Sequence, residues 1–197
     1  GKVEKLVKKA KKRISLDGNI GIGHTRWATH SEPNDVNAHP ILSNNESLVI
    51  VHNGIIENYA TIKNELISKG YKFESETDTE VLVNLIEYVQ LTEKVKLGKA
   101  VQLALSQVVG AYAIAVFDKK KPDEIVVARL GSPLAIGIGD GEMFIGSDVT
   151  PFLDFTRKVI YLEEGQIGVL RTHKETKFYD ISNDSIISPT IETLELE

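Results

Sequence analysis

Residues 111–117 read Ala-Tyr-Ala-Ile-Ala-Val-Phe, and this stretch decides the fold. A strand with one face in water alternates apolar and polar residues, whereas this strand is apolar on both faces, so its sheet must be covered above and below. The strand-like segments that follow, residues 124–129, 134–138 and 143–145, are joined by short polar or glycine links. Such links allow antiparallel hairpins but not helical crossovers, so the sequence predicts an antiparallel sheet inside a layered domain.

Three helical patterns precede this sheet, at residues 56–69, 77–91 and 97–109, where apolar side chains recur every three or four positions. We expect a second sheet, built partly from residues 20–23 and 48–51, with helices outside each sheet. The sequence pattern alone gives the class α+β.

Composition excludes several classes of protein. The 197 residues, 42% of them hydrophobic, suit one domain, and the longest apolar runs are far too short to span a membrane. A net charge of -5 argues against broad nucleic-acid binding, and the absence of cysteine excludes disulfides and thiolate metal sites. We expect a soluble cytoplasmic protein with neither a nucleic-acid nor a membrane partner.

The one basic concentration, residues 2–13, has an ordinary explanation. Apolar side chains recur in it at helical spacing, so its lysines are expected on the solvated face of an amphipathic helix. The apolar positions are Val3, Leu6, Val7, Ala10 and Ile14.

The most polar cluster is the heptapeptide His24-Thr25-Arg26-Trp27-Ala28-Thr29-His30. The planar guanidinium of Arg26 matches a carboxylate through two parallel hydrogen bonds, and the neighbouring hydroxyl and imidazole groups add directional partners. The cluster therefore predicts a pocket for a small anionic molecule. Trp27 belongs either to this pocket or to the core, since a large aromatic side chain is often buried.

The dipeptide Asn53-Gly54 follows the strand-like residues 48–51. It is a hairpin-turn signal, yet residues 55–70 have helical spacing, so we interpret it as a junction between strand and helix. At such a junction the Gly54 N–H and the Asn53 amide can form an oxyanion hole. The plain-turn interpretation stays open.

Asp78 lies in the polar stretch of residues 75–80. Thr77 and Glu80 fit a capping box, and Asp78 is then a first-turn acid that the helix dipole favours. Alternatively, its carboxylate receives the ammonium group of a ligand. Together with Arg26 it would then bind an α-amino acid.

These segments resemble one family. The similarity includes residues 24–30, 52–58 and 75–80, and also Asn37-Ala38-His39-Pro40, Gly131-Ser132-Pro133-Leu134 and Leu162-Glu163-Glu164-Gly165. Nearly the whole chain is similar to the glutaminase domains of glutamine-fructose-6-phosphate aminotransferases, also called glucosamine-6-phosphate synthases. These are class II glutamine amidotransferases of the N-terminal-nucleophile hydrolase type.

The resemblance implies a four-layer αββα sandwich and a site for L-glutamine. By the resemblance, Asn53 and Gly54 are catalytic and stabilise the oxyanion, while Arg26 binds the carboxylate and Asp78 the ammonium group. Trp27, Thr29 and His30 fall in the loop that closes over glutamine. His39 and His52 either support the pocket or are structural.

The resemblance also implies the reaction and its partners. Glutamine is hydrolysed without a cofactor or metal, and the ammonia passes to a sugar isomerase domain of the same polypeptide, which converts fructose 6-phosphate to glucosamine 6-phosphate. The parent protein is implied to be a homo-oligomer.

The nucleophile of this family is an N-terminal cysteine, and this chain contains none. An internal serine or threonine cannot replace it simply, because its backbone nitrogen is an amide without basicity. We therefore expect residues 1–197 to be a glutaminase domain that is incomplete at its N-terminus and inactive alone, with the isomerase domain downstream and not present.

Two alternatives remain. One is an amino-acid-binding module without catalysis. The other is a metal hydrolase, because four of the five histidines lie between positions 24 and 52, although no His-Glu-x-x-His helix is present.

Overall fold

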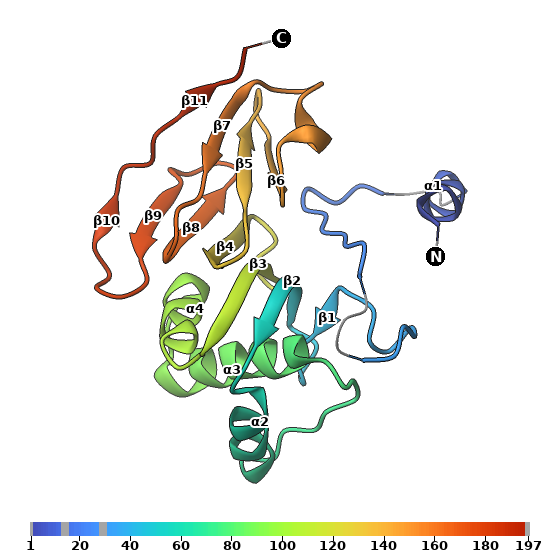
Figure 1. Ribbon diagram of the computed structural model, residues 1–197, viewed down its shortest axis with the longest axis vertical. Coiled ribbons are helices and arrows are strands. Elements are labelled where there is room, and N and C mark those ends of the chain that lie inside the picture. Colours follow the sequence, from blue (N-terminus) through green and yellow to red (C-terminus); the bar gives the residue numbers. More distant parts are fainter. Residues whose placement is uncertain (1, 13–15, 28–30, 196–197) are drawn as a thin grey trace.

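The computed structural model describes residues 2–12, 16–27 and 31–195. Its framework is two antiparallel sheets that face each other (Figure 1). The seven-stranded sheet has the order β1 (Ile41–Leu42), β2 (Leu48–Ile56), β3 (Gly110–Asp118), β4 (Glu124–Leu130), β8 (Gln166–Arg171), β9 (Lys177–Asp180) and β10 (Ile186–Ile187). The four-stranded sheet has the order β11 (Glu192–Thr193), β7 (Lys158–Tyr161), β5 (Ala135–Ile138) and β6 (Met143–Gly146).

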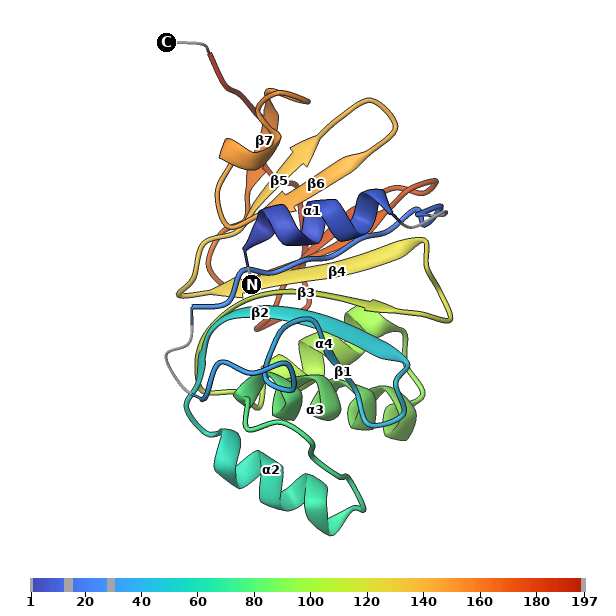
Figure 2. The ribbon, with the colours of Figure 1, turned by 90° about the vertical axis from the view of Figure 1, so that its right-hand side faces the viewer.

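Helices α3 (Asp78–Glu93) and α4 (Leu97–Leu105) cover the outer face of the seven-stranded sheet, and α2 (Tyr59–Ser68) packs against α3 on the side away from the sheet (Figure 2). In β3, Ile114 and Val116 pack in the core beneath these helices, whereas Ala113 and Ala115 pack between the sheets. The prediction that β3 is covered on both faces is confirmed.

On the four-stranded sheet, Phe152 of the short 3-10 helix η1 (Thr150–Phe152) packs on Ala135 and Val159. Within the described residues, the layers follow in the order helices, sheet, sheet, with η1 packed on the second sheet. The α+β class and the mainly antiparallel sheets are confirmed. Within the described residues, η1 is the helical part of the fourth layer.

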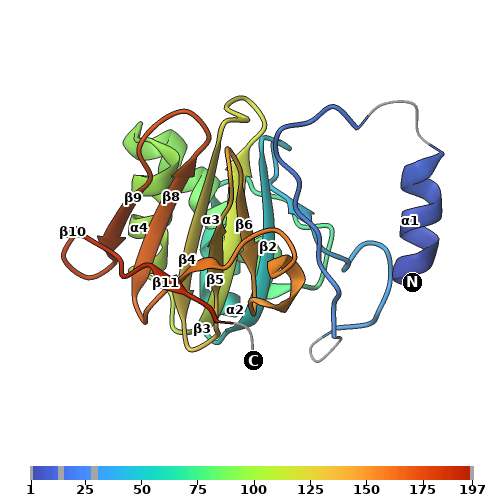
Figure 3. The ribbon, with the colours of Figure 1, turned by 90° about the horizontal axis from the view of Figure 1, so that it is seen from above.

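The basic segment forms the expected helix, α1 (Val3–Lys11), at the side of the sandwich (Figure 3). None of its described residues is buried, and Leu6 is 67% exposed. The apolar stripe is therefore present but has no packing partner in the described part of the chain, and Ile14 lies outside the described residues. No helix of the described ranges is both long enough and apolar enough to cross a bilayer.

The predicted membership of the second sheet is wrong. Residues 20–23 form no strand, and residues 48–51 belong to β2, which pairs with β3 in the same sheet. The ladder runs from Leu48 opposite Asp118 to Ile56 opposite Gly110, so two apolar strands far apart in sequence lie side by side. Strand-like composition indicates burial, but it does not indicate which edge a strand joins.

Candidate functional site

The candidate site lies at one edge of β2. The short strand β1 pairs only with Val49 and Ile50, so the following part of that edge has no strand beside it within the described residues. His24 and His39 lie there, because His24 contacts Asn53 and the His39 ring stacks on that of His24. Polar groups from three distant segments therefore meet where the sheet is unpaired.

Asn53 and Gly54 lie inside β2 rather than at a turn or a junction, which corrects both interpretations of this dipeptide. Helix α2 begins only at Tyr59. Gly54 has φ +121°, and a Cβ there would lie 2.2 Å from the carbonyl oxygen of Ala111 in β3. Glycine is therefore required at this position by the neighbouring strand, at a backbone conformation that other residues rarely adopt.

A cavity of about 300 Å³ opens beside Asn53, at the lower end of the range for small-molecule sites. Residues 23–25 and 51–53 supply one part of its wall, and the inner face of β3 supplies another. The wall is completed by Pro133, Leu134, Ile145, Gly146, Ser147 and Pro151. The cavity includes Asn53, but Gly54, Arg26 and Asp78 do not line it, so the structure brings only part of the predicted site together.

A larger cavity, of about 530 Å³, lies farther along the space between the sheets and shares Ile145 with the first. Its wall combines aliphatic side chains with polar and charged ones, including Asp123, Arg171 and His173. None of the predicted site residues lines it, so the smaller cavity is the candidate site.

Arg26 is half-buried, and its guanidinium donates hydrogen bonds to the Ser31 hydroxyl and, at 3.4 Å, to the Glu32 carbonyl. A guanidinium has five N–H donors, and three of them make no hydrogen bond within the described residues. The Trp27 side chain is 89% exposed, so the alternative that Trp27 is a core residue is wrong. Thr29 and His30 lie outside the described residues.

Asp78 is buried at the first position of α3 but does not cap it. Thr77 is the cap, with its hydroxyl accepting the Glu80 N–H at 3.2 Å, and the Glu80 carboxylate reaches back to the N–H of Ser75 at 2.7 Å. The predicted capping box is therefore present in a modified form, in which the Glu80 carboxylate accepts the N–H of Ser75 rather than that of Thr77. Asp78 Oδ2 accepts the Ile56 N–H at 2.8 Å, whereas Oδ1 makes no hydrogen bond within the described residues.

Thr79 connects two histidines, a role for which the sequence carries no signal. His52 Nε2 faces the Ala111 carbonyl at 3.4 Å, and a carbonyl can only accept, so Nε2 carries the proton and Nδ1 is bare. The Thr79 hydroxyl therefore donates to His52 Nδ1 at 2.9 Å and accepts from His39 Nε2 at 3.0 Å. In this arrangement each of the two imidazoles bonds to the Thr79 hydroxyl.

Burial keeps these two imidazoles neutral. The pKa of His39 is lowered to about 3, first by burial and then by the nearby His24, His52 and Arg26. The pKa of His52 is also lowered by burial, although the Asp78 carboxylate opposes this shift. His39 and His52 are therefore hydrogen-bonding groups here rather than cations.

His24, His39 and His52 do not converge on a common point. Among the described residues, no group of three His, Asp or Glu side chains has the arrangement of a metal site. The imidazole nitrogens of His24, His39 and His52 are directed instead at Asn53, Thr79 and the Ala111 carbonyl.

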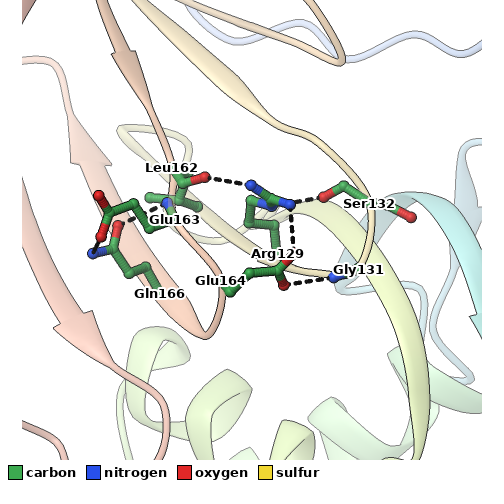
Figure 4. A network of polar contacts seen from close by, with 7 residues as sticks. All are labelled: Arg129, Gly131, Ser132, Leu162, Glu163, Glu164 and Gln166. Atoms are coloured by element: carbon green, nitrogen blue, oxygen red, sulfur yellow. Dashed lines mark hydrogen bonds and ion pairs between the residues drawn. The ribbon is translucent and has the colours of Figure 1, made fainter.

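Arg129 fixes the corner where the chain passes from β4 to β5 and so from one sheet to the other (Figure 4). It donates to the carbonyls of Ser132 at 2.8 Å and Leu162 at 3.0 Å and to Glu164 Oε1 at 2.8 Å, while Glu164 Oε2 accepts the Gly131 N–H at 2.7 Å. This network holds the turn after β7 against the segment that leads into Pro133. It thereby supports one wall of the cavity.

Comparison with known proteins identifies relatives of this arrangement. Residues 10–178 match the family model described as a glutamine amidotransferase domain. The glutamine-fructose-6-phosphate aminotransferase (isomerizing) of Bacteroides thetaiotaomicron is 55% identical over 182 residues, covering 92% of this chain and 30% of the relative. The same-named protein of Escherichia coli is 45% identical over 193 residues, covering 98% and 31%. The chain thus spans about 30% of the length of these relatives.

Among solved structures, the glutamine phosphoribosylpyrophosphate amidotransferase of B. subtilis, complexed with ADP and GMP, has a similar fold. The TM-score is 0.66 at 26% identity, over 81% of this chain and 34% of that chain.

Proposed function

The chain belongs to the glutamine amidotransferase family, and on this premise we propose that it is the glutamine-hydrolysing part of a glutamine-fructose-6-phosphate aminotransferase. In this proposal it releases ammonia from L-glutamine in the cytoplasm, and a sugar isomerase domain of the same polypeptide uses the ammonia to make glucosamine 6-phosphate. The proposed parent enzyme is a homo-oligomer. Identities of 55% and 45% to proteins of that name support the assignment.

The observation that carries the proposal is the position of Asn53 on the cavity wall, directly before Gly54 in β2. A nucleophile attacks the side-chain amide carbon of glutamine, and negative charge develops on the amide oxygen. The Asn53 amide and the Gly54 N–H stabilise this charge, ammonia leaves, and water then releases glutamate. No residue among the 197 is a cysteine, so the proposed thiolate nucleophile comes from beyond them.

The proposed amino-acid clamp uses the two charged residues flanking this region. Within the described residues, three Arg26 guanidinium donors remain for the α-carboxylate, and Asp78 Oδ1 remains for the α-ammonium group. Trp27, Thr29 and His30 are proposed to close over the bound molecule. Because Gly54, Arg26 and Asp78 do not line the cavity, the proposed binding mode extends the glutamine beyond the cavity wall toward these three groups.

Calorimetric titration of this chain with L-glutamine tests the clamp. We expect saturable binding that Arg26→Ala abolishes and that the matched control Arg157→Ala, outside the cavity wall, leaves unchanged. Glutamate release is then measured in the full-length polypeptide. Binding without any glutamate release would favour the non-catalytic amino-acid-binding module, and the absence of binding would contradict the proposal altogether.

A further inference from the structure

Asn53 is exposed on β2, and within the described residues its side-chain amide is held by one residue from a distant segment. His24 Nε2 lies 2.6 Å from Asn53 Oδ1, across 29 residues of sequence. The His24 segment, residues 20–27, has no regular secondary structure, so the position of the imidazole depends on its contacts with other segments.

The direction of this bond follows from the other ring nitrogen. His24 Nδ1 is buried and has no hydrogen-bond partner within the described residues. If the Asn53 NH₂ group donated to a bare Nε2, the proton would sit on Nδ1 and leave a buried N–H unpaired, which is rare in proteins. With the proton on Nε2, His24 donates to Oδ1, and the Asn53 NH₂ group is directed away from His24.

The ring itself is fixed by stacking. His39 lies parallel to His24, with ring centroids 4.5 Å apart and an interplanar angle of 23°. His39 is in turn held through Nε2 by Thr79 of α3 at 3.0 Å. A continuous series of contacts therefore runs from the rigid helix α3 through Thr79, His39 and His24 to Asn53.

We propose that His24 is a positioning residue, which holds the Asn53 amide so that its nitrogen rather than its oxygen faces the reacting oxygen of the substrate. The terminal torsion of asparagine has a broad, roughly two-fold preference, so an unheld amide would also present its oxygen. An amide oxygen there would repel the developing negative charge. The catalytic part of this inference rests on the proposed function, whereas the orientation of the amide does not.

The orientation of the Asn53 amide can be tested in this chain by a measurement that does not depend on catalysis. Nitrogen-15 NMR of the histidine rings distinguishes a protonated from a bare ring nitrogen, and the His24 signals are assigned from their loss in His24→Gln. We expect a protonated Nε2 and a bare Nδ1 in His24, and a shifted Asn53 side-chain amide signal in His24→Ala but not in the control His173→Ala. A protonated Nδ1 with a bare Nε2 would overturn the inference.

The consequence is tested in the full-length polypeptide. Loss of an oxyanion donor lowers kcat by about 10² to 10³-fold, so we expect about a tenfold to hundredfold loss in His24→Ala, where the amide is correctly oriented part of the time. The KM for glutamine should change little, and His24→Gln, whose amide nitrogen can donate to Oδ1, should recover part of the loss. His173→Ala should retain normal kcat.

A double variant separates positioning from an independent role. If His24 acts through Asn53, adding His24→Ala to Asn53→Ala should cost nothing further, whereas independent effects would multiply and overturn the inference. An absence of glutamate release in the unaltered polypeptide would contradict the proposed function instead, and the NMR result would still decide the orientation.

Discussion

Replacing Gly54 with alanine adds one methyl group at a crowded point of β2. The backbone there has φ +121°, and the new Cβ would lie 2.2 Å from the Ala111 carbonyl oxygen and 2.7 Å from its carbonyl carbon. Both contacts are with backbone atoms, so a side-chain rotation cannot relieve them. Strands β2 and β3 must separate locally, or the conformation of Gly54 must change.

Two effects contribute to the cost. A residue held in an unfavourable backbone region costs about 1 to 3 kcal/mol, and overpacking typically costs about 1 to 3 kcal/mol more. The expected loss is thus about 2 to 6 kcal/mol out of a total free energy of unfolding of about 5 to 15 kcal/mol. At a denaturant slope of about 2 kcal/mol/M, the urea midpoint should fall by about 1 to 3 M.

Gly70→Ala is the matched control, because Gly70 also has positive φ, +91°, but apart from its chain neighbours no atom lies within 4 Å of the point that a Cβ would occupy. Like Gly54→Ala, this variant places alanine in an unfavourable backbone conformation and reduces the conformational freedom of the unfolded chain. Unlike Gly54→Ala, it creates no contact with a neighbouring strand. Both midpoints are measured by circular dichroism in urea. A Gly54→Ala midpoint equal to that of Gly70→Ala would refute the argument that β3 excludes a side chain at position 54.

Three further predictions concern the polar groups around the site. Asp78→Asn should weaken L-glutamine binding, measured by calorimetry, by about 2 to 5 kcal/mol, because one partner of a desolvated charge pair is lost; unchanged affinity would leave Asp78 with only its bond to Ile56. Thr79→Val should lower the free energy of unfolding in urea by about 1 to 3 kcal/mol, because it leaves the buried nitrogens of His39 and His52 unpaired. Thr79→Ser keeps the hydroxyl and should have nearly the same free energy of unfolding as the unaltered chain. Equal losses in the two variants would contradict the role of the Thr79 hydroxyl between the two histidines. The pKa of His39 is about 3 in the folded state, against a reference value of 6.5, so between these pH values the unfolded state binds more protons than the folded state. The free energy of unfolding should therefore fall as the pH is lowered from 6.5 towards 3. In His39→Gln the urea midpoint should fall less steeply over this range, and an unchanged slope would contradict the role of His39.

The sequence by itself determined the helices and the burial of β3 on both faces. Periodic apolar residues predicted helices that correspond to α2, α3 and α4, although α2 begins at Tyr59 and α4 ends at Leu105, inside the predicted bounds. The two-sided apolar character of β3 predicted a covered sheet, which the two cores confirm. These features follow from the sequence because they depend on neighbours within one or two turns of helix or along one strand.

The sequence also indicated the family through local motifs, and the family is now established. The roles of Arg26, Trp27, Asn53, Gly54 and Asp78 remain predictions. Their spacing indicates chemistry but not geometry, as the position of Asp78 shows: its Oδ2 is already bonded to the Ile56 N–H, a contact between the start of a helix and the end of a distant strand.

Only the tertiary structure decided which strands share a sheet and which side chains meet. Asn53-Gly54 has the local signal of a turn, but pairing of β2 with β3 over nine residue pairs holds it in a strand. The bonds of His24 to Asn53 and of His39 to Thr79 cross 29 and 40 residues of sequence. The local periodicity of a segment indicates which of its faces is buried. Contacts such as those of His24 and His39 depend instead on how separate elements pack against each other. That packing follows from long-range strand pairing, which no short stretch of sequence encodes.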